Sequence, residues 1–386
     1  MAVLSETELI TIRRHLHQIP ELALQEFQTH DYLIEEIRKF KQDYLEIKVP
    51  ESLPTAILVL IHGSKPQRTI GYRADIDALP VEEQTGLAYS STHPGVMHAC
   101  GHDIHMTVAL GLLSYFSENQ PQDNLLFFFQ PAEESESGGK RAYELGVFSG
   151  KWHPDEFYGL HDNPALPAGS IGCRMGTLFA GTTEVNIDLI GKSGHAAFPQ
   201  NATDTVVAAA SLIMQIQTII SRSIDPIQSG VITLGKVEAG TIRNVIAGRT
   251  HIEGTIRGLT QTMILEIDQR LKDLCEGIAH SYNMEVKLDL NQGGYWPVEN
   301  NPELTKRFIS YMKENPKVDF IETKPAMTGE DFGFLLAKFP GTMFWLGVGD
   351  NSQLHSATLT PDESSINKGI RAIKDFLIYR MKAQND

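Results

Sequence analysis

The sequence has few cysteines, and this scarcity excludes a fold held together by disulfides. Only three occur in 386 residues, at Cys100, Cys173 and Cys275. Their odd number and wide spacing do not fit the paired framework of small secreted domains. The N-terminal stretch lacks a basic start followed by an apolar block, so we expect no signal peptide. These features predict a reduced, cytoplasmic protein.

Positive charge is also scarce relative to negative charge. The chain has 33 Lys and Arg against 48 Asp and Glu, a formal net charge of −15. A net negative field repels polyanions, so we expect no nucleic-acid partner. No uninterrupted apolar run approaches the roughly 20 residues of a membrane-spanning helix, so we expect no membrane partner either.

Several common catalytic signatures are missing. The chain has no G-x-x-x-x-G-K-[ST] loop and no G-x-G-x-x-G after a strand, which argues against nucleotide binding. It lacks the G-x-S-x-G elbow of serine hydrolases and the H-E-x-x-H helix of many zinc proteases.

Two different patterns of apolar residues are present. Runs without alternation, such as Ala56–Ile61 and Leu125–Phe129, are separated by helical stretches. This predicts an α/β fold with a mainly parallel sheet covered on both faces. The order β-α-β-β-α-β within 182–290 is typical of a ferredoxin-like α+β domain. We therefore expect a larger domain in two parts, residues 1–179 and 292–386, with a smaller domain inserted at 180–291.

Reactive side chains gather directly after the predicted strands. In chain order they are Asp75, the stretch Met97–His105, the pair Glu133 and Glu134, and His161 behind a run that ends at Leu160. Sites in open α/β sheets form at the carboxyl ends of strands. We therefore expect these groups to converge on one crevice.

Each signal is ambiguous alone. A Cys-x-His such as Cys100-Gly101-His102 is most often a buried cysteine beside a surface histidine. Adjacent carboxylates usually lie in a solvated turn, and single histidines such as His161 and His355 are usually structural. Together, however, one Cys, one Glu and three His form a ligand set for two cations that share one bridging ligand. A bridging cysteine favours Zn²⁺, Co²⁺ or Mn²⁺ over Mg²⁺ or Ca²⁺.

The chain resembles the metal-dependent amidohydrolases that include aminoacylase, hippurate hydrolase and plant auxin-conjugate hydrolases. The motifs behind this resemblance run nearly end to end: HQIPEL (17–22), GYRADIDALP (71–80), MHACGHDIH (97–105), FFFQPAEE (127–134), GLHD (159–162), SGHAAFP (193–199), TIRNVIA (241–247), GTIRG (254–258), TGEDF (328–332) and LHS (354–356). The resemblance implies a dinuclear-metal catalytic domain and an inserted lid and dimerisation domain. It implies hydrolysis of an N-acyl bond on a small amino-acid substrate by a homodimer.

Within this family, two stretches favour a narrower activity. QPAEESESGGKRAYELG (130–146) and NQGGYWPVENN (291–301) resemble the branch that removes acetate from an N-acetylated diamino dicarboxylate in bacterial lysine biosynthesis. The open alternatives are a general N-acyl-amino-acid amidohydrolase, a dipeptidase, and a metal-binding regulatory module without catalysis. The last would be favoured by loss of Asp75 or Glu133, and both are present.

The resemblance also implies a role for each matching residue. The metal ligands would be Cys100, His102, Glu134, His161 and His355, with Cys100 as the bridge. Asp75 would orient a ligand, and Glu133 would be the general base and then the acid, although Glu133 and Glu134 could exchange roles.

Three further residues of the inserted domain gain a role only through the resemblance. His195 and Asn244 would polarise the scissile carbonyl, either within one chain or across subunits. Arg257 would hold a substrate carboxylate.

Overall fold

The structure is a computed structural model that describes residues 3–382, and these residues form two compact units. Unit 2 comprises Phe179–Pro297 and Pro325–Gly333, and unit 1 comprises the rest of the chain. Unit 2 therefore extends beyond the expected insertion at 180–291. The added segments belong to it because the carbonyls of Tyr295 and Ala326 accept hydrogen bonds from the N–H groups of Thr182 and Ala180, at 2.9 Å each.

Unit 1 is built on an eight-stranded sheet in the order β1-β2-β4-β3-β5-β14-β6-β13. The strands are β1 Leu45–Lys48, β2 Ile57–Ile61, β3 Thr69–Asp75, β4 Asn124–Gln130, β5 Glu156–Asn163, β6 Ile171–Cys173, β13 Phe320–Glu322 and β14 Gly341–Gly347. The central strands β4, β3, β5 and β14 are parallel, whereas β2 and β6 pair antiparallel with their neighbours on the central side. The predicted mainly parallel sheet is confirmed.

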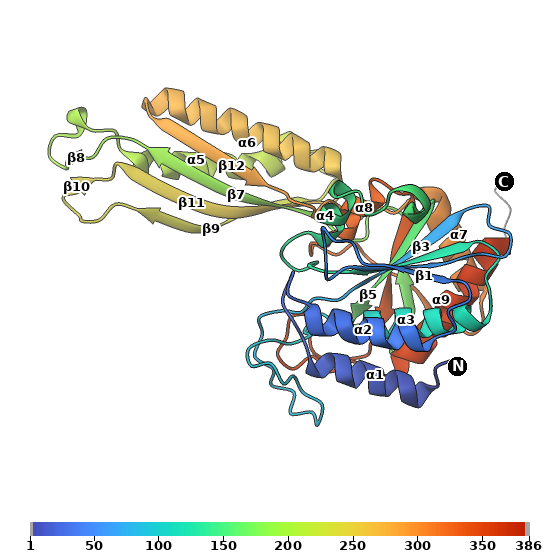
Figure 1. Cartoon of the computed structure of the whole chain (residues 1–386). Helices are drawn as coiled ribbons and strands as arrows, with labels where there is room; N and C mark the ends of the chain where they lie inside the picture. The colour runs from blue at the N-terminus through green and yellow to red at the C-terminus, as the bar shows by residue number, and fades with distance from the viewer. Residues whose placement is uncertain (1–2, 383–386) are drawn as a thin grey trace. The chain divides into compact units, whose positions relative to one another are not determined.

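Helices cover the sheet of unit 1 (Figure 1). They are α1 Glu6–Gln18, α2 Phe27–Lys39, α3 His102–Glu118, α4 Gly138–Glu144, α7 Pro302–Glu314, α8 Phe332–Leu336, which begins in unit 2, and α9 Ser364–Lys382, with a short 3-10 turn at Gly150–Trp152. Nearly every residue of α3 is buried, because α1, α2 and α9 pack around it. Most of the α3 sequence is accordingly apolar, and the charged or ionisable residues among its buried positions, His102, Asp103 and His105, lie in its first turn.

The carboxyl ends of the parallel strands meet at one edge of the sheet, and this edge carries the polar clusters. We expected the fourth strand to end at Leu160, but β5 continues to Asn163 because His161 and Asp162 remain paired with β14. His161 therefore lies near the C-terminal end of a strand and not on a loop.

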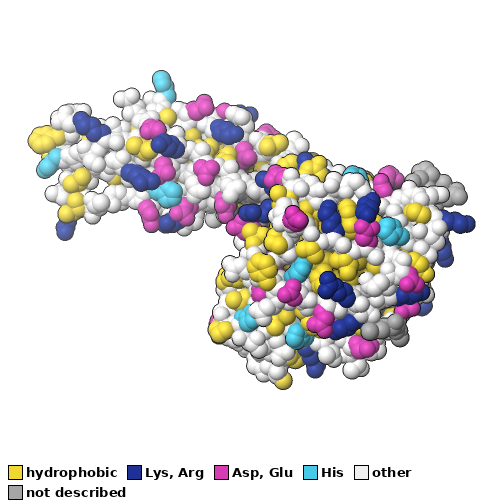
Figure 2. Space-filling model, viewed as in Figure 1, with side chains coloured by type: hydrophobic (Ala, Val, Ile, Leu, Met, Phe, Trp, Pro, Cys, Tyr) yellow, Lys and Arg dark blue, Asp and Glu magenta, His cyan; other side chains and the backbone are white. Residues whose placement is uncertain are grey.

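Unit 2 is a four-stranded antiparallel sheet in the order β12-β7-β11-β9, the arrangement of the predicted ferredoxin-like domain. Its elements are β7 Gly181–Ile190, β8 Gly194–His195, a 3-10 turn Pro199–Asn201, α5 Thr205–Thr218, a π turn Ile219–Ser223, β9 Gly230–Ala239, β10 Val245–Ile246, β11 Arg249–Gly258, α6 Gln261–Tyr282 and β12 Glu285–Asn291. Helices α5 and α6 pack on one face of this sheet. On the face of unit 2 seen in Figure 2, acidic and basic side chains are interspersed.

The segment Thr205–Ser223 is long and apolar enough to cross a membrane by length and composition alone. In the structure it is α5 with the following π turn, and Ala208, Leu212 and Ile216 pack in the core of unit 2. A core helix of a globular domain satisfies the same criteria.

Candidate metal centre

A left-handed glycine sets the position of Cys100 and His102. Gly101 has a φ of 81° and is the N-cap of α3, so His102 is the first residue of a buried helix. A Cβ at position 101 would lie 2.1 Å from Oδ2 of Asp162. Only glycine therefore allows this backbone and this close approach together, which places the thiol and the imidazole beside the end of β5.

A closed loop after β4 presents Glu133 and Glu134. The N–H of Gly138 donates to the carbonyl of Ala132 at 2.9 Å, and a Cβ at Gly138 would lie 1.7 Å from the carbonyl oxygen of Pro131. The loop therefore returns on itself immediately beyond the acidic pair. Glu133 is buried, and Glu134 is largely buried.

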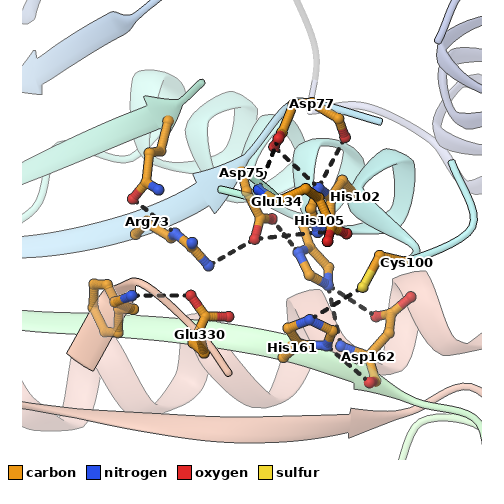
Figure 3. Close-up of polar contacts among 12 residues, drawn as sticks. Arg73, Asp75, Asp77, Cys100, His102, His105, Glu134, His161, Asp162 and Glu330 are labelled. Carbon is orange, nitrogen blue, oxygen red and sulfur yellow. Dashed lines mark hydrogen bonds and ion pairs between the residues drawn. The ribbon is translucent and has the colours of Figure 1, made fainter. Parts of the chain in front are cut away.

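His161 and His355 reach the same thiol from two further segments. Nε2 of His161 lies 3.5 Å from Sγ of Cys100, and Nε2 of His355 lies 3.4 Å from it. The His355 backbone is anchored by its N–H, which donates to the carbonyl of Ala99 at 2.8 Å. Figure 3 shows Cys100, His102, Glu134 and His161 directed toward one another at the carboxyl edge of the sheet.

The donor atoms fall into two groups that share Cys100. Within each group the ligand atoms lie within 4.8 Å of one another: Cys100, His102 and His161 form one, and Cys100, Glu134 and His355 form the other. All five predicted ligands are thus brought together, and the thiol occupies the shared position. One sulfur, one carboxylate and three imidazoles suit Zn²⁺, Co²⁺ or Mn²⁺.

Backbone carbonyls fix the tautomers of two of these histidines. Nδ1 of His102 lies 2.9 Å from the carbonyl oxygen of Asp77, and Nδ1 of His161 lies 3.0 Å from that of Asp162. A carbonyl can only accept, so Nδ1 carries a proton in both rings, and Nε2 is the nitrogen that can bind a cation in exchange for a proton. Metal-binding histidines are commonly oriented in this way.

The electrostatics favour positive charge between these ligands. Burial acts to lower the pKa of His102, but Asp75, Asp77 and Glu134 raise it to about 10. Burial raises the pKa of Glu134 to about 7 and that of the Cys100 thiol well above its usual range. Nε2 of His102 and Oε1 of Glu134 are buried without a hydrogen-bond partner within residues 3–382. A cation would satisfy all of these groups, so the residues fit a metal site.

Behind the ligands lies a layer of buried charges, of which the sequence predicts a role for Asp75 alone. Oδ2 of Asp75 lies 2.7 Å from Nη1 of Arg73, and His105 contacts Asp75 through Nδ1 and Asp162 through Nε2, the latter at 3.5 Å. Burial opposes the charge on Asp75, yet Arg73 and the histidines hold its pKa well below the usual range. Burial acts to lower the pKa of His105, but Asp75 and Asp162 raise it to about 9.

Asp75 and Asp77 divide the contacts with His102. Asp75 lies on the Nε2 side, with Oδ2 at 3.4 Å, whereas Asp77 contacts the Nδ1 side. The residue that orients the ring through Nδ1 is therefore Asp77. Its position two residues beyond Asp75, on the same segment, was the available signal.

The remaining predicted residues, His195, Asn244 and Arg257, lie in unit 2. His195 pairs with Val245 in the short β8–β10 ladder, beyond the end of β7 at Ile190. Asn244 directly precedes β10, and both it and His195 are exposed. Nδ1 of His195 accepts from the N–H of Ala197 at 3.1 Å, so Nε2 of the neutral ring carries a proton that it can donate.

Arg257 lies at the opposite end of the same sheet. It pairs with Thr182 at the start of β7, whereas Arg249 pairs with Ile190 at the end of β7. The eight steps from Arg249 to Arg257 span about 26 Å at about 3.3 Å per residue. The structure therefore does not bring His195 and Arg257 together within one chain.

Comparison with known proteins places this arrangement in a family. The family model described as Peptidase family M20/M25/M40 matches residues 71–379. An N-acetyldiaminopimelate deacetylase of Lactobacillus helveticus is 83% identical over 382 residues, which covers 99% of this chain and 100% of the relative. One of Limosilactobacillus reuteri is 80% identical over 380 residues, covering 98% and 100%.

A solved structure has the same architecture over nearly the full length of both chains. It is a dinuclear metal-binding peptidase of the M20 family from Bacillus subtilis, 28% identical, with a TM-score of 0.86 and coverage of 98% of this chain and 99% of that one. The amidohydrolase resemblance is confirmed, and the chain belongs to peptidase family M20/M25/M40.

Proposed function

We propose that this protein hydrolyses N-acetyl-LL-2,6-diaminopimelate to LL-2,6-diaminopimelate and acetate, as a step of bacterial lysine biosynthesis in the cytoplasm. The observation that carries this proposal is the 83% identity, over 99% of the chain, with an N-acetyldiaminopimelate deacetylase. The site is consistent with it, because a hydrolytic ligand set and a buried carboxylate base stand together at the sheet edge.

Two divalent cations per chain would be held by Cys100, His102, Glu134, His161 and His355, with Cys100 shared. When bound, such cations supply Lewis-acid chemistry that makes water more acidic and stabilises negative charge on an acyl oxygen. We propose Zn²⁺, Co²⁺ or Mn²⁺, because thiolate and imidazole ligands suit these ions.

The protein side chains would carry the proton transfers. Glu133 accepts a proton from the attacking water as the new C–O bond forms, and it then donates that proton to the amine as the C–N bond breaks. The Nε2–H of His195 donates to the acyl oxygen, with Asn244 as its neighbour. Arg257 holds a carboxylate of the substrate.

These roles require two chains. A diaminopimelate molecule is shorter than four extended residues, about 13 Å, so it cannot reach both His195 and Arg257 of one chain across about 26 Å of sheet. We therefore propose a homodimer in which the partner subunit supplies His195 and Asn244 to the site.

The pairing surface we propose is edge strand β9 together with α5. Val231 and Val237 on β9 and Val206, Val207 and Met214 on α5 are exposed apolar side chains. The opposite edge strand, β12, has exposed charged residues at alternate positions, a pattern that discourages strand pairing. A second copy of this chain is the occupant that would also complete the site.

Mixing two inactive variants tests the dimer. Glu133→Gln and His195→Ala homodimers should each be nearly inactive. After subunit exchange, half of the dimers are hybrids, and each hybrid has one site with both residues intact. Activity should recover to about a quarter of the wild-type value. A mixture no more active than its parents, despite exchange shown by native mass spectrometry, would contradict the shared site, as would an active monomer in light scattering.

One candidate contact for the distal end of the substrate is an acidic side chain that would bind its ammonium group. Glu136 is a candidate for meeting the substrate ammonium group, but its Oε2 lies 2.5 Å from Nη2 of Arg141, and Ser137 beside it is buried. A carboxylate already paired with arginine is a poor partner for a second cation.

A substrate panel tests the narrow activity against the general one. We expect kcat/KM for N-acetyl-LL-diaminopimelate to exceed that for N-ε-acetyl-lysine and N-acetyl-methionine by at least ~10-fold. The two analogues lack the second amino-acid head group, so the protein groups that would bind it stay unpaired, at a cost of about 1–3 kcal/mol for a buried group. Released amine is quantified for each. Equal values would show a general N-acyl-amino-acid amidohydrolase, and preferred cleavage of a dipeptide would show a dipeptidase.

A further inference from the structure

A buried carboxylate outside the proposed ligand set contacts the loop that carries Glu133. Glu26 is fully buried at the start of α2. Its Oε1 accepts hydrogen bonds from the N–H of Ala132 and from the N–H of Leu24, both at 2.9 Å. The contact with Ala132 joins segments more than 100 residues apart in sequence, and Ala132 immediately precedes Glu133.

Both residues that donate to Glu26 have an unusual backbone. Ala132 has a φ of 60° and Leu24 a φ of 62°, in the left-handed region that L side chains rarely adopt. Such a conformation costs of order 1–3 kcal/mol and persists only where surrounding contacts impose it. The carboxylate of Glu26 is the side-chain contact that both of these amides share.

A second carboxylate holds the other side of Glu133. Oδ2 of Asp77 accepts from the N–H of Glu134 at 2.9 Å. The amides immediately before and after Glu133 are therefore both bound by buried carboxylates, and the backbone of Glu133 lies between two fixed points. Burial and the charge of Asp77 raise the pKa of Glu26 to about 7. This agrees with the carboxylates of Glu26 and Asp77 both binding the short segment from Ala132 to Glu134.

We propose that Glu26 is a positioning residue for Glu133. By holding the Ala132 amide in a left-handed turn, it directs the Glu133 carboxylate toward the ligand cluster, where Glu133, His102 and Glu134 have oxygen and nitrogen atoms within 4.8 Å of one another. Glu26 belongs to neither of the two proposed donor groups and acts through the backbone beside Glu133. This role rests on the proposed base function of Glu133.

The kinetic test compares Glu26→Ala with Glu26→Gln in the metal-loaded dimer. Alanine removes the acceptor, so kcat should fall about 10–100-fold, the range expected when a reacting group is displaced by about 1 Å. KM and metal content should stay within about twofold, because no ligand is changed. Glutamine keeps an acceptor oxygen of similar reach and should restore kcat to within about threefold of wild type. Equal losses in both variants, or a loss of metal, would overturn the proposal.

A readout without catalysis separates this proposal from the proposed function. Amide hydrogen exchange of the loop peptide around 127–138 should be at least about 10-fold faster in Glu26→Ala than in wild type or Glu26→Gln, whether or not any substrate is turned over. Unchanged exchange in the alanine variant would overturn the positioning role even in a fully active enzyme. Absence of acetate release from wild type would instead overturn the proposed function and leave the exchange result interpretable.

Glu156→Gln is the matched control for loss of a buried carboxylate. Glu156 is buried at the first residue of β5, away from the carboxyl edge, and its two oxygens lie 2.9 and 2.6 Å from Nε and Nη2 of Arg380. This variant should lower the melting temperature while leaving kcat and loop exchange unchanged. A fall in kcat equal to that of Glu26→Ala would show that general destabilisation explains both.

Discussion

Replacing Glu133 with Gln is expected to lower kcat by about 10²–10⁴-fold, the usual contribution of a positioned general acid–base group. Glutamine has nearly the same shape but cannot accept a proton from water. The Glu133 backbone should remain in place, because Glu26 and Asp77 bind the amides on either side of it. KM should change little, since the missing interaction belongs to the transition state. Steady-state acetate release measures both constants.

Glu134→Gln is the control that separates base from ligand. Glu134 belongs to the donor group with Cys100 and His355, so its variant should bind metal less tightly, whereas Glu133→Gln should keep its full metal content. Elemental analysis after reconstitution distinguishes the two. If Glu133→Gln stays within a few-fold of wild type, another residue is the base, and a metal-replete but inactive Glu134→Gln would identify it.

Replacing Cys100 with Ala is expected to abolish both metal binding and turnover. Cys100 is common to both donor groups, so one substitution removes a ligand from each of the two proposed sites. Activity should fall about 10³-fold or more, because a catalytic metal contributes several kcal/mol and each 1.4 kcal/mol is a factor of ten. Metal content should fall from about two equivalents per chain to well below one.

Cys173→Ala is the matched control for the loss of a buried thiol. Cys173 is also free and buried, it packs in the hydrophobic core of unit 1, and its Sγ lies 3.7 and 3.8 Å from the backbone carbonyls of Met343 and Arg174. This variant should keep its metals and kcat, with a loss of stability of about 1 kcal/mol. A fully active, metal-free Cys100→Ala protein would overturn the metal mechanism.

The sequence predicted the elements and the convergence of the ligands because both follow from short-range patterns. Unbroken apolar runs identify strands buried on both faces, and parallel strands bring their carboxyl ends together. From the sequence alone, Cys100, Glu134 and His161 could therefore be expected at one edge of the sheet. The position at which β5 ends could not be predicted, because His161 and Asp162 are polar residues that stay in the strand through pairing with β14.

The roles of Glu26, Glu136 and the register-dependent positions could not be predicted, because their contacts depend on the folded chain and not on a local sequence pattern. Glu26 lies on a different segment from Ala132, and an isolated Glu in a sequence is usually solvated. The pairing of Glu136 with Arg141 depends on the closed loop before α4. The separation of His195 and Arg257 follows only from the register of β7 and β11, which fixes their distance along the sheet.

Because peptide carbonyls orient His102 and His161, the main chain sets the direction of the two ring nitrogens that we propose as metal ligands. No point substitution deletes a carbonyl, so the identity of Asp77 or Asp162 can change without removing the group that holds each ring. The centre is therefore a suitable framework for redesign. The thiolate and carboxylate positions can be exchanged to alter ion preference, while the carbonyls of Asp77 and Asp162 keep the rings of His102 and His161 in place.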